Sequence, residues 1–584
     1  MAENNQTKAV NQAGFEIYDS RPWLKYFSGT KKPDIDMAAG YQSYGEMVSD
    51  ASRTHGKNPA FTTCLPAGIS GTLSFDKVEK YSNQFAAYLR FTLNLKKGDR
   101  VAIQSPNCLA YPIFLFGAAK AGCAIVNINP LYTPAEMEFA LKDSGAKLLL
   151  IIDMFANKLE KVLPHTEVKT VLLHNIAEFF PPLRKWLVKT VQRRKKMLPP
   201  CLVPHVAFAS ALENGEAQLA EGRSPIEWQV RLDDLLALQY TGGTTGRPKG
   251  AMLTHRNLVA NGAQSFNNLQ QNLVPNLVAM TPLPMYHIFA LGVCGVLYRV
   301  GAHNILIPSP RPVANLRKAF EKFNIQFMCG VNTLYAGLLN EEWFRQHPPQ
   351  SLKTAIGGGA AIQDAVAIRW KEVVGERLIQ GYGLTETSPT VTTNPIDGPE
   401  KLGSIGLPGA STYVRIVDDQ GNAVPLGERG ELIVKGPQVM TGYWQQPDET
   451  AIALRDGWLY TGDIATMDDD GFFYIVDRKK DMVLVSGFNV YPTEVEEVLA
   501  KHPGILEAGV VGVPNEETGE AVIAYVVKRD AALSEADIRK HCREFLTPYK
   551  IPKSVIFASE LPKTPVGKIL RKDLRAQALQ EMGK

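Results

Sequence analysis

Short, continuous apolar runs alternate with longer amphipathic stretches along the first part of the chain. The runs VAIQSPN, KLLLII and TVLLH are rich in consecutive apolar residues, which is typical of strands that are buried on both faces. The stretch from Thr72 to Ser105 begins with a helical pattern, and IFLFGAAKAG has the composition of a helix that packs closely through small residues. The alternation predicts an α/β fold, with a large N-terminal body of parallel or mixed sheets covered by helices on both faces.

The pattern changes twice toward the C-terminus. From 403 to about 476, Val- and Ile-rich runs are broken by the turn sequences DDQGN and PLGERG, which predicts a small β-subdomain. Beyond it, helical segments alternate with strand-like runs such as LEAGVVGV, and Thr493 with Glu496 is expected to form a capping box. We therefore expect a large N-terminal domain over residues 1–479 and a small, mobile α+β domain over residues 480–584.

The stretch YTGGTTGRPKG, from Tyr240 to Gly250, is the clearest candidate for phosphate binding. Glycines leave backbone N–H groups accessible to an anion, hydroxyls add donors, and a lysine supplies positive charge. The stretch is not the common P-loop, because Arg247 and Pro248 separate the last of its inner glycines from the lysine. Taken alone, it could equally be a solvent-exposed turn. The residues expected to grip phosphate are Thr241, Gly242, Gly243, Thr244, Thr245, Gly246 and Lys249. A helical pattern follows an N-cap at Thr254, so we expect the loop to lie just ahead of a helix.

Two later segments, TAIGGGA and RLIQGYGLTE, each contain an apolar run that ends in glycines. In sheets of this class ligands bind at the carboxyl ends of strands, so we expect these ends and the glycine-rich loop to share one site. Thr385 and Glu386 follow the second run and could contact a phosphate and its Mg²⁺. On its own, Glu386 would more often be a capping or surface acid.

Composition narrows the class of protein. A chain of 584 residues exceeds one hydrophobic core, which agrees with more than one domain. The net charge of +4 is small for this length, so nucleic acid is not an expected partner. No apolar window reaches the roughly 20 residues of a spanning helix, and no export signal is visible at the start. The seven cysteines form no CxxC pair, so we expect a cytoplasmic protein without a disulfide framework or a zinc site.

A basic and apolar segment interrupts the α/β pattern at 179–200. Seven residues from Arg184 to Lys196 are Lys or Arg, and the whole segment contains no acid. Trp186, Leu187 and Val191 can share one apolar helical face, which is typical of a helix that lies on a membrane surface. We therefore predict peripheral contact with an anionic membrane, on the cytoplasmic face of the inner membrane. The alternative is a solvated surface insertion that binds nothing.

Five strings occur in a fixed order: YTGGTTGRPKG, GYGLTE, YTGD, DRKKD and PKTPVGK. Together they resemble the adenylate-forming superfamily of acyl-CoA synthetases, luciferases and peptide-synthetase adenylation domains, over roughly Tyr44 to Lys584. DGWLYTGDIATMDDDGFFYIVDRKK, IQGYGLTETSP and LVSGFNVYPTEVE are more narrowly similar to the bacterial long-chain fatty acyl-CoA synthetases. The resemblance implies that a fatty carboxylate attacks the α-phosphate of MgATP to give acyl-AMP and pyrophosphate, and that CoA then displaces AMP.

The resemblance also implies roles for individual residues. Tyr382 would stack on adenine, Asp463 would accept both ribose hydroxyls, and Arg478 would support the same ribose. Lys568 would bridge the acyl carboxylate and the α-phosphate. The implied catalytic residues are Lys568, Thr385 and Glu386, with Glu386 as the metal ligand. The implied ATP-binding residues are those of the glycine-rich loop with Gly359, Ala360, Gly381, Tyr382, Gly383, Thr385, Asp463 and Arg478.

The segment DRKKD contains Lys480, where the family places its hinge. The implied motion would present Lys568 for the first step and then turn the small domain for the second. Ser486, Gly487 and Phe488 would then approach the thiol-transfer site and bind CoA. An exposed charged turn is compatible with this interpretation, because a hinge is usually exposed.

The implied acyl pocket lies around MYHIF. Its expected lining is Tyr286, His287, Phe289, Val331 and Gly357. A lone histidine in such a loop is more often a packing residue than a catalyst. No aspartate stands near Tyr286, which disfavours an amino-acid substrate, and Leu291 occupies the position where one long-chain relative has a tryptophan gate.

Other functions stay open at this point. A medium-chain or aryl acid:CoA ligase would use the same fold, and a non-enzymatic membrane-bound fatty-acid carrier belongs to another class. A luciferase or a peptide-synthetase module is disfavoured, since no oxidative chemistry or carrier domain is indicated. The sequence does not fix the oligomeric state, so a homodimer remains open.

Overall fold

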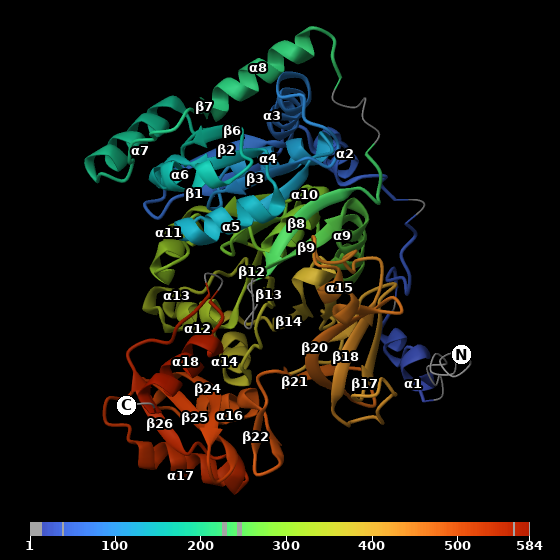
Figure 1. Ribbon diagram of the computed structural model, residues 1–584, viewed down its shortest axis with the longest axis vertical. Coiled ribbons are helices and arrows are strands. Elements are labelled where there is room, and N and C mark those ends of the chain that lie inside the picture. The colour runs from blue at the N-terminus through green and yellow to red at the C-terminus, as the bar shows by residue number, and fades with distance from the viewer. Residues whose placement is uncertain are drawn as a thin grey trace.

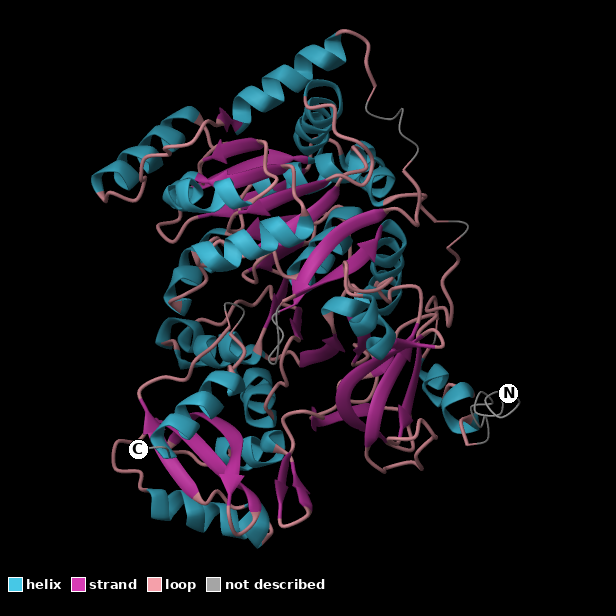
Figure 2. Cartoon of the chain, viewed as in Figure 1, coloured by secondary structure: helices cyan, strands magenta, loops and turns pink. Residues whose placement is uncertain are grey.

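A computed structural model describes residues 14–27, 29–37, 40–224, 230–241, 248–564 and 567–582 (Figure 1). Within these residues the strands form four sheets, two large ones in the N-terminal body and two smaller ones beside it (Figure 2). The α/β fold with a separate C-terminal domain agrees with the expectation from the apolar runs.

The first large sheet has seven strands, all parallel except for the hairpin formed by its last two. In spatial order these are β7 (Val206–Ala207), β6 (Thr170–His174), β5 (Leu148–Ile152), β3 (Arg100–Gln104), β4 (Ala124–Ile128), β8 (Leu235–Thr241) and β9 (Lys249–Thr254). The three runs VAIQSPN, KLLLII and TVLLH supply neighbouring strands of this sheet, as their apolar character predicts.

The second large sheet has nine strands. In spatial order these are β16 (Leu407–Pro408), β15 (Thr390–Thr393), β14 (Leu378–Gly383), β13 (Thr354–Gly357), β12 (Phe327–Gly330), β10 (Val278–Thr281), β11 (His303–Leu306), β1 (Pro59–Cys64) and β2 (Ser70–Ser74). The strands from β14 to β1 are parallel, so β13 and β14 deliver their terminal glycines to the same edge.

Helices cover both large sheets. One core joins the two sheets through α2 (Tyr44–His55), α3 (Phe75–Ala87), α4 (Ala110–Lys120), α9 (His255–Leu269) and α10 (Ile288–Arg299). The other faces are covered by α5 (Pro134–Ser144), α6 (Leu159–Val162), α11 (Arg317–Lys322), α12 (Asn332–Asn340), α13 (Glu342–Gln346) and α14 (Asp364–Val374). Two further helices, α7 (Pro182–Arg194) and α8 (Phe208–Ala220), lie at the end of the body far from the C-terminal domain (Figure 1).

The predicted β-rich region is a sheet of its own. Its strands are β17 (Tyr413–Val417), β18 (Gly430–Lys435), β19 (Leu454–Arg455), β20 (Trp458–Met467) and β21 (Phe473–Arg478), with α15 (Pro447–Ala453) beside them. The stretch just after 403 instead adds β16 to the nine-stranded sheet. The N-terminal α1 (Glu16–Asp19) packs on this sheet, and Phe15, Tyr18 and Trp23 enter its core.

The last sheet is built from the tail of the chain. Its strands are β22 (Val483–Val485), β23 (Phe488–Val490), β24 (Ile505–Asn515), β25 (Gly519–Lys528) and β26 (Ser554–Ala558). Around them pack α16 (Pro492–Ala500), α17 (Glu535–Phe545) and α18 (Arg571–Met582). The chain passes from the β21 sheet to the β22 sheet between Arg478 and Val483.

Two local predictions are wrong. The glycine-rich loop does not directly precede a helix, because β8 and β9 form an antiparallel hairpin around it and β9 separates it from α9; the expected Thr254 cap of α9 is present. The Thr493 and Glu496 side chains form no capping box on α16, whose N-cap is Tyr491. Both side chains instead bind Arg571, a partner that lies far along the chain.

Candidate active site

A cavity of about 1440 Å³ lies where the two large sheets, the β21 sheet and the C-terminal domain meet. The carboxyl ends of β8, β13 and β14 open onto it, as the glycine-ended runs predict. The predicted residues that line it are Thr241, Lys249, Tyr286, His287, Phe289, Val331, Gly357, Gly359, Ala360, Gly381, Tyr382, Gly383, Thr385, Glu386, Asp463, Arg478, Lys480 and Lys568. Gly242, Gly243, Thr244, Thr245 and Gly246 lie outside the described residues.

The two ends of the glycine-rich loop are held as facing residues of the β8–β9 hairpin, Thr241 opposite Lys249. The Lys249 ammonium forms an ion pair with Glu449 of α15 and lies over the ring of Tyr443, 5.1 Å from its centroid. A carboxylate therefore neutralises this lysine. No local sequence pattern marks Glu449 as a partner of Lys249, because it stands 200 residues away in an ordinary polar stretch.

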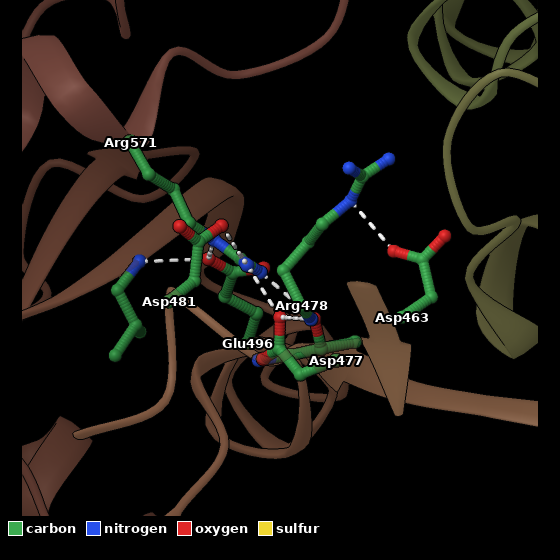
Figure 3. A network of polar contacts seen from close by, with 8 residues as sticks. Asp463, Asp477, Arg478, Asp481, Glu496 and Arg571 are labelled. Atoms are coloured by element: carbon green, nitrogen blue, oxygen red, sulfur yellow. Dashed lines mark hydrogen bonds and ion pairs between the residues drawn. The ribbon is translucent and has the colours of Figure 1, made fainter. Parts of the chain in front are cut away.

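A buried hydrogen-bonded group occupies the junction of β14, β20 and β21. The Tyr382 hydroxyl donates to Asp463 Oδ2 at 2.5 Å, and Arg478 Nε pairs with Asp463 Oδ1 at 2.6 Å. Figure 3 shows the Arg478 side chain directed toward Asp463. Burial, and next the Asp463 charge, hold the pKa of Tyr382 well above its usual value. Aromatic ring, carboxylate and guanidinium are thus fixed beside one another on the cavity wall.

Glu386 lies in the turn that follows β14. The Tyr443 hydroxyl donates to Glu386 Oε1 at 2.8 Å, and the Met440 amide donates to the Glu386 carbonyl at 2.8 Å. Burial, followed by the charge of Glu386, raises the pKa of Tyr443. Among the described residues, no group of three or more His, Cys, Asp or Glu side chains is placed to hold a metal ion. Glu386 is therefore a single carboxylate facing the cavity rather than part of a preformed metal cage.

Lys568 reaches the cavity from the C-terminal domain. Its loop closes through Thr564, whose hydroxyl accepts from the Lys568 amide at 3.0 Å, and docks on α12, where the Thr333 hydroxyl donates to the Gly567 carbonyl at 3.3 Å. Gly567 has φ +94°, and a Cβ there would come within 2.6 Å of Thr333 Oγ1, the hydroxyl on which the loop docks. This position therefore requires glycine both for its backbone conformation and for close approach to the body.

The Lys568 side chain is accessible to water in the cavity, but protein surrounds it on all sides. The resulting desolvation, and secondly the nearby Arg478 guanidinium, lower its pKa to about 8. The amine therefore stays largely protonated at neutral pH and places a positive charge in the cavity that Asp463 and Arg478 also line.

An apolar arm of the cavity runs between α9 and α10. Tyr286, Phe289 and Val331 belong to its predicted lining, but another wall was not predicted. That wall is made of Leu269, Leu273, Val293, Val296, Leu297 and Phe327, and Asn261, Ser265 and Asn268 of α9 add polar groups. The spacing of the α10 residues indicates one apolar helical face, but the sequence could not tell a face that lines a cavity from one that packs in a core.

His287 and Leu291 have structural places at this arm. The His287 ring nitrogen Nδ1 accepts from the Phe289 amide at 3.3 Å and caps α10. Burial, and next the Lys568 charge, lower the pKa of His287 to about 4, so the ring is neutral at physiological pH. Leu291 is fully buried in the core and does not line the cavity.

The predicted CoA-binding residues do not lie at the cavity. Ser486 and Gly487 form the turn between β22 and β23, with φ of 50° and 83°. Phe488 is 56% exposed and stacks on Tyr549 with ring centroids 4.8 Å apart. The same loop arrangement that brings Lys568 into the cavity leaves this turn outside it.

The segment 179–200 forms α7 on the outer surface of the body. Leu183 and Trp186 are 76% and 64% exposed, and Leu187 and Val191 are also exposed, so the apolar face predicted for this helix meets solvent. Among its cations, Arg184 donates to the Ser70 carbonyl and Lys185 pairs with Glu178, both within the body. No helix of the described chain is long and apolar enough to cross a membrane.

Comparison with known proteins places this site in a family. A model of the AMP-binding enzymes matches residues 48–444, and a model of the AMP-binding enzyme C-terminal domain matches residues 494–568. A long-chain-fatty-acid–CoA ligase of Yersinia pestis is 47% identical over 96% of this chain and 98% of its own. One of Haemophilus influenzae is 43% identical over 96% and 99%. The crystal structure of an anthranilate CoA ligase, AuaEII, in complex with anthranoyl-AMP, is similar with a TM-score of 0.80 and 25% identity, over 93% of this chain and 98% of that one.

Proposed function

The chain belongs to the AMP-binding enzyme family, and on that premise we propose that it is a long-chain fatty acid:CoA ligase. In the first step a fatty carboxylate attacks the α-phosphate of ATP, forming acyl-AMP and releasing pyrophosphate. In the second step the CoA thiolate attacks the acyl carbon, forming acyl-CoA and releasing AMP. The observation that carries the proposal is one cavity that joins nucleotide-type polar groups to an apolar arm, in a chain 47% identical to such ligases.

The polar half of the cavity would hold ATP. The β- and γ-phosphates would be held by Thr241, the loop that follows it and Lys249. The Lys249 ammonium would then leave Glu449 and pair with the phosphates. Tyr382 stacks on adenine, while Asp463 accepts the ribose hydroxyls in the lone-pair directions that Tyr382 and Arg478 leave unused. The pairing of Asp463 with Arg478 orients its carboxylate before ATP arrives.

Glu386 fits the role of a Mg²⁺ ligand. Mg²⁺ is usually held by one or two carboxylates together with substrate phosphates, which suits a single cavity-facing carboxylate with Thr385 beside it. The ion, when bound with ATP, would neutralise phosphate charge. Tyr443 orients the Glu386 carboxylate through its hydrogen bond to Oε1, and the other carboxylate oxygen would be available to hold the ion.

Lys568 would act in the first step. Two anions, the fatty carboxylate and the α-phosphate, must approach each other, and a cation between them stabilises the charge that develops. No covalent enzyme intermediate is needed, so positioning and charge account for the catalysis. We propose that the domain boundary lies between residues 479 and 480, and that rotation at Lys480 withdraws Lys568 and brings Ser486, Gly487 and Phe488 to the acyl-AMP for thiol transfer.

The preferred length of the acid separates this proposal from a medium-chain or aryl acid ligase. We expect acyl-CoA formation with palmitate and oleate to exceed that with octanoate and benzoate in kcat/KM, because deeper methylenes contact Leu269, Leu297 and Phe327. A CoA-thiol consumption assay over these four acids tests the substrate. A preference for octanoate or benzoate would contradict it, and fatty-acid binding without ATP-dependent thioester formation would indicate the carrier instead.

The first step is expected to depend on the protonation of Lys568. Its pKa of about 8 means that the charged form is present below about pH 8 and is lost as the pH rises above it. Because kcat/KM reports groups of the free enzyme, we expect kcat/KM for ATP to fall above about pH 8. The fall should move to higher pH in Lys568→Arg, since arginine stays protonated. A flat profile in the parent enzyme across this range would contradict the role of the amine.

We further propose that α7 rests on an anionic membrane at the cytoplasmic face. Its exposed leucines and tryptophan would enter the interface, and each basic residue near an anionic surface adds about 1 kcal/mol. Among the described residues, Lys189, Arg193, Arg194, Lys195 and Lys196 form no hydrogen bond or ion pair with the body, so the variant should reverse these five cations. We expect co-sedimentation with phosphatidylserine-containing vesicles to weaken at least about tenfold.

A matched variant would reverse five cations of the C-terminal domain, Lys501, Arg529, Lys540, Arg543 and Lys553. Its vesicle binding should stay at the parental value, and neutral phosphatidylcholine vesicles should bind the parent weakly. Equal losses in both variants would indicate an effect of net charge alone and would contradict a specific α7 surface.

A further inference from the structure

A buried cluster of charges connects the loop of Lys568 to the segment that precedes Lys480 (Figure 3). Arg571, three residues after Lys568 and first in α18, lies at its centre. Its Nη1 donates to Asp477 Oδ1 at 2.7 Å, and its Nη2 donates to Glu496 Oε2 at 2.7 Å and to the Thr493 hydroxyl at 2.8 Å. One guanidinium thus holds a residue of β21 together with two residues of α16.

These partners lie on opposite sides of Lys480. Asp477 is in β21, and the next residues are tied to the same sheet, since the Lys479 amide donates to the Gly462 carbonyl and its ammonium pairs with Asp419. Thr493 and Glu496 belong to α16, and Arg571 belongs to α18; both helices are part of the C-terminal domain. Of the three partners described above, Asp477 alone reaches Arg571 from across the passage between the two sheets.

Asp477 has both carboxylate oxygens engaged. Oδ1 accepts from Arg571, and Oδ2 accepts from the Thr493 backbone amide at 2.7 Å. Its side chain is 1% exposed, which removes solvent screening and strengthens both contacts. Two charge-assisted hydrogen bonds therefore fasten the C-terminal domain in the position that brings Lys568 into the cavity.

The cluster also allows the C-terminal domain to separate from Asp477 without leaving Arg571 unpaired. If the C-terminal domain turns about Lys480, Asp477 stays with β21 while Arg571 moves with Glu496, Asp481 and the Thr493 hydroxyl. The guanidinium would therefore not be left unpaired in the interior, which would be costly. Within this cluster only the two contacts to Asp477, from Arg571 and from the Thr493 amide, break, and its carboxylate can then be hydrated.

From this arrangement we propose that Asp477 is a positioning residue: its contacts with Arg571 and the Thr493 amide hold the domain in the adenylate-forming position and are broken before thiol transfer. The proposal rests on the proposed function, because it assigns the two positions of the domain to its two steps. Because its carboxylate oxygens are engaged by Arg571 and the Thr493 amide, we assign Asp477 no substrate contact; it acts through the placement of Lys568.

The test is the ratio of the two half-reactions in the full-length enzyme. Adenylate formation is followed by palmitate-dependent exchange of pyrophosphate into ATP, and thiol transfer by the conversion of added palmitoyl-AMP to palmitoyl-CoA in a single turnover. For Asp477→Asn, which keeps the side-chain shape, we expect the exchange rate to fall about tenfold, the scale of one lost charge-assisted hydrogen bond. The thiol-transfer rate should stay equal or rise.

Glu496→Gln is the matched control, because Glu496 binds the same guanidinium from the same side of Lys480. It should change both half-reactions in the same proportion. Arg571→Lys is a second variant in case Asp477→Asn does not fold. It keeps the positive charge but loses the planar guanidinium, so the ratio of the exchange rate to the thiol-transfer rate should fall in the same way. An unchanged ratio in both Asp477→Asn and Arg571→Lys would overturn the proposal, and a parent enzyme unable to make palmitoyl-AMP would overturn the proposed function itself.

Discussion

Replacement of Lys568 by alanine is expected to lower the steady-state rate of palmitoyl-CoA formation about 10²- to 10³-fold, the usual effect of removing one preorganised charge from a reacting centre. The ammonium enters the cavity from a loop that is docked on Thr333 and closed by Thr564, so it is positioned before the substrates bind. Without it, the carboxylate and the α-phosphate would meet with their charges uncompensated. The loss should appear in kcat/KM for both ATP and palmitate, because both anions contact the amine.

The variant is measured by CoA-thiol consumption with saturating CoA, beside Lys563→Ala as a control. Lys563 lies in the same loop and lines the cavity, but its ammonium is paired with Glu507. We expect the control to keep its rate within a few-fold of the parent. A parental rate in Lys568→Ala would show that another group carries the charge.

The second large effect is expected from Asp463→Ala. The carboxylate accepts from Tyr382 at 2.5 Å and pairs with Arg478 at 2.6 Å, and it is almost fully buried. Its loss removes the proposed ribose contact and leaves the guanidinium without its partner on the cavity wall. At about 1.5 kcal/mol for each of two charge-assisted hydrogen bonds, kcat/KM for ATP should fall about 10²-fold.

Initial rates over a range of ATP concentrations test this expectation. The effect should lie mainly in KM for ATP, with KM for palmitate changed much less. Asp419→Ala is a suitable control, because Asp419 is 77% exposed and pairs with Lys479 next to Arg478 without lining the cavity. Equal changes in the KM values of ATP and palmitate would argue against a nucleotide-specific role of Asp463.

Much of the candidate site followed from local sequence. TAIGGGA and RLIQGYGLTE each predict a strand that ends in glycines, and parallel strands bring their carboxyl ends to one edge, so Gly357, Gly381 and Tyr382 had to lie close together. The change to hairpin-rich and then mixed patterns likewise indicated separate units toward the C-terminus. The placement of Lys568 did not follow from periodicity; it was implied only by the resemblance.

Contacts between residues far apart in the chain could not be predicted from the local sequence pattern. Thr493 and Glu496 have the spacing of a capping box. Their side chains instead accept hydrogen bonds from the Arg571 guanidinium, and these bonds form in place of the local capping bonds. The sequence did not indicate that Glu449 pairs with Lys249, since an acid in a short polar helix is usually solvated. The α9 and α10 residues that line the cavity have the apolar spacing of a helix packed in a core. This spacing is the same whether side chains or a ligand fill the space beside the helix.

The central claim is that Lys568 serves the first step and withdraws from the second. The most direct test is to supply Lys568→Ala with synthetic palmitoyl-AMP and CoA and to measure palmitoyl-CoA in a single turnover, beside exchange of pyrophosphate into ATP with palmitate. The account predicts thiol transfer at close to the parental rate and exchange lowered at least about 10²-fold. Loss of thiol transfer to the same degree as exchange would contradict it.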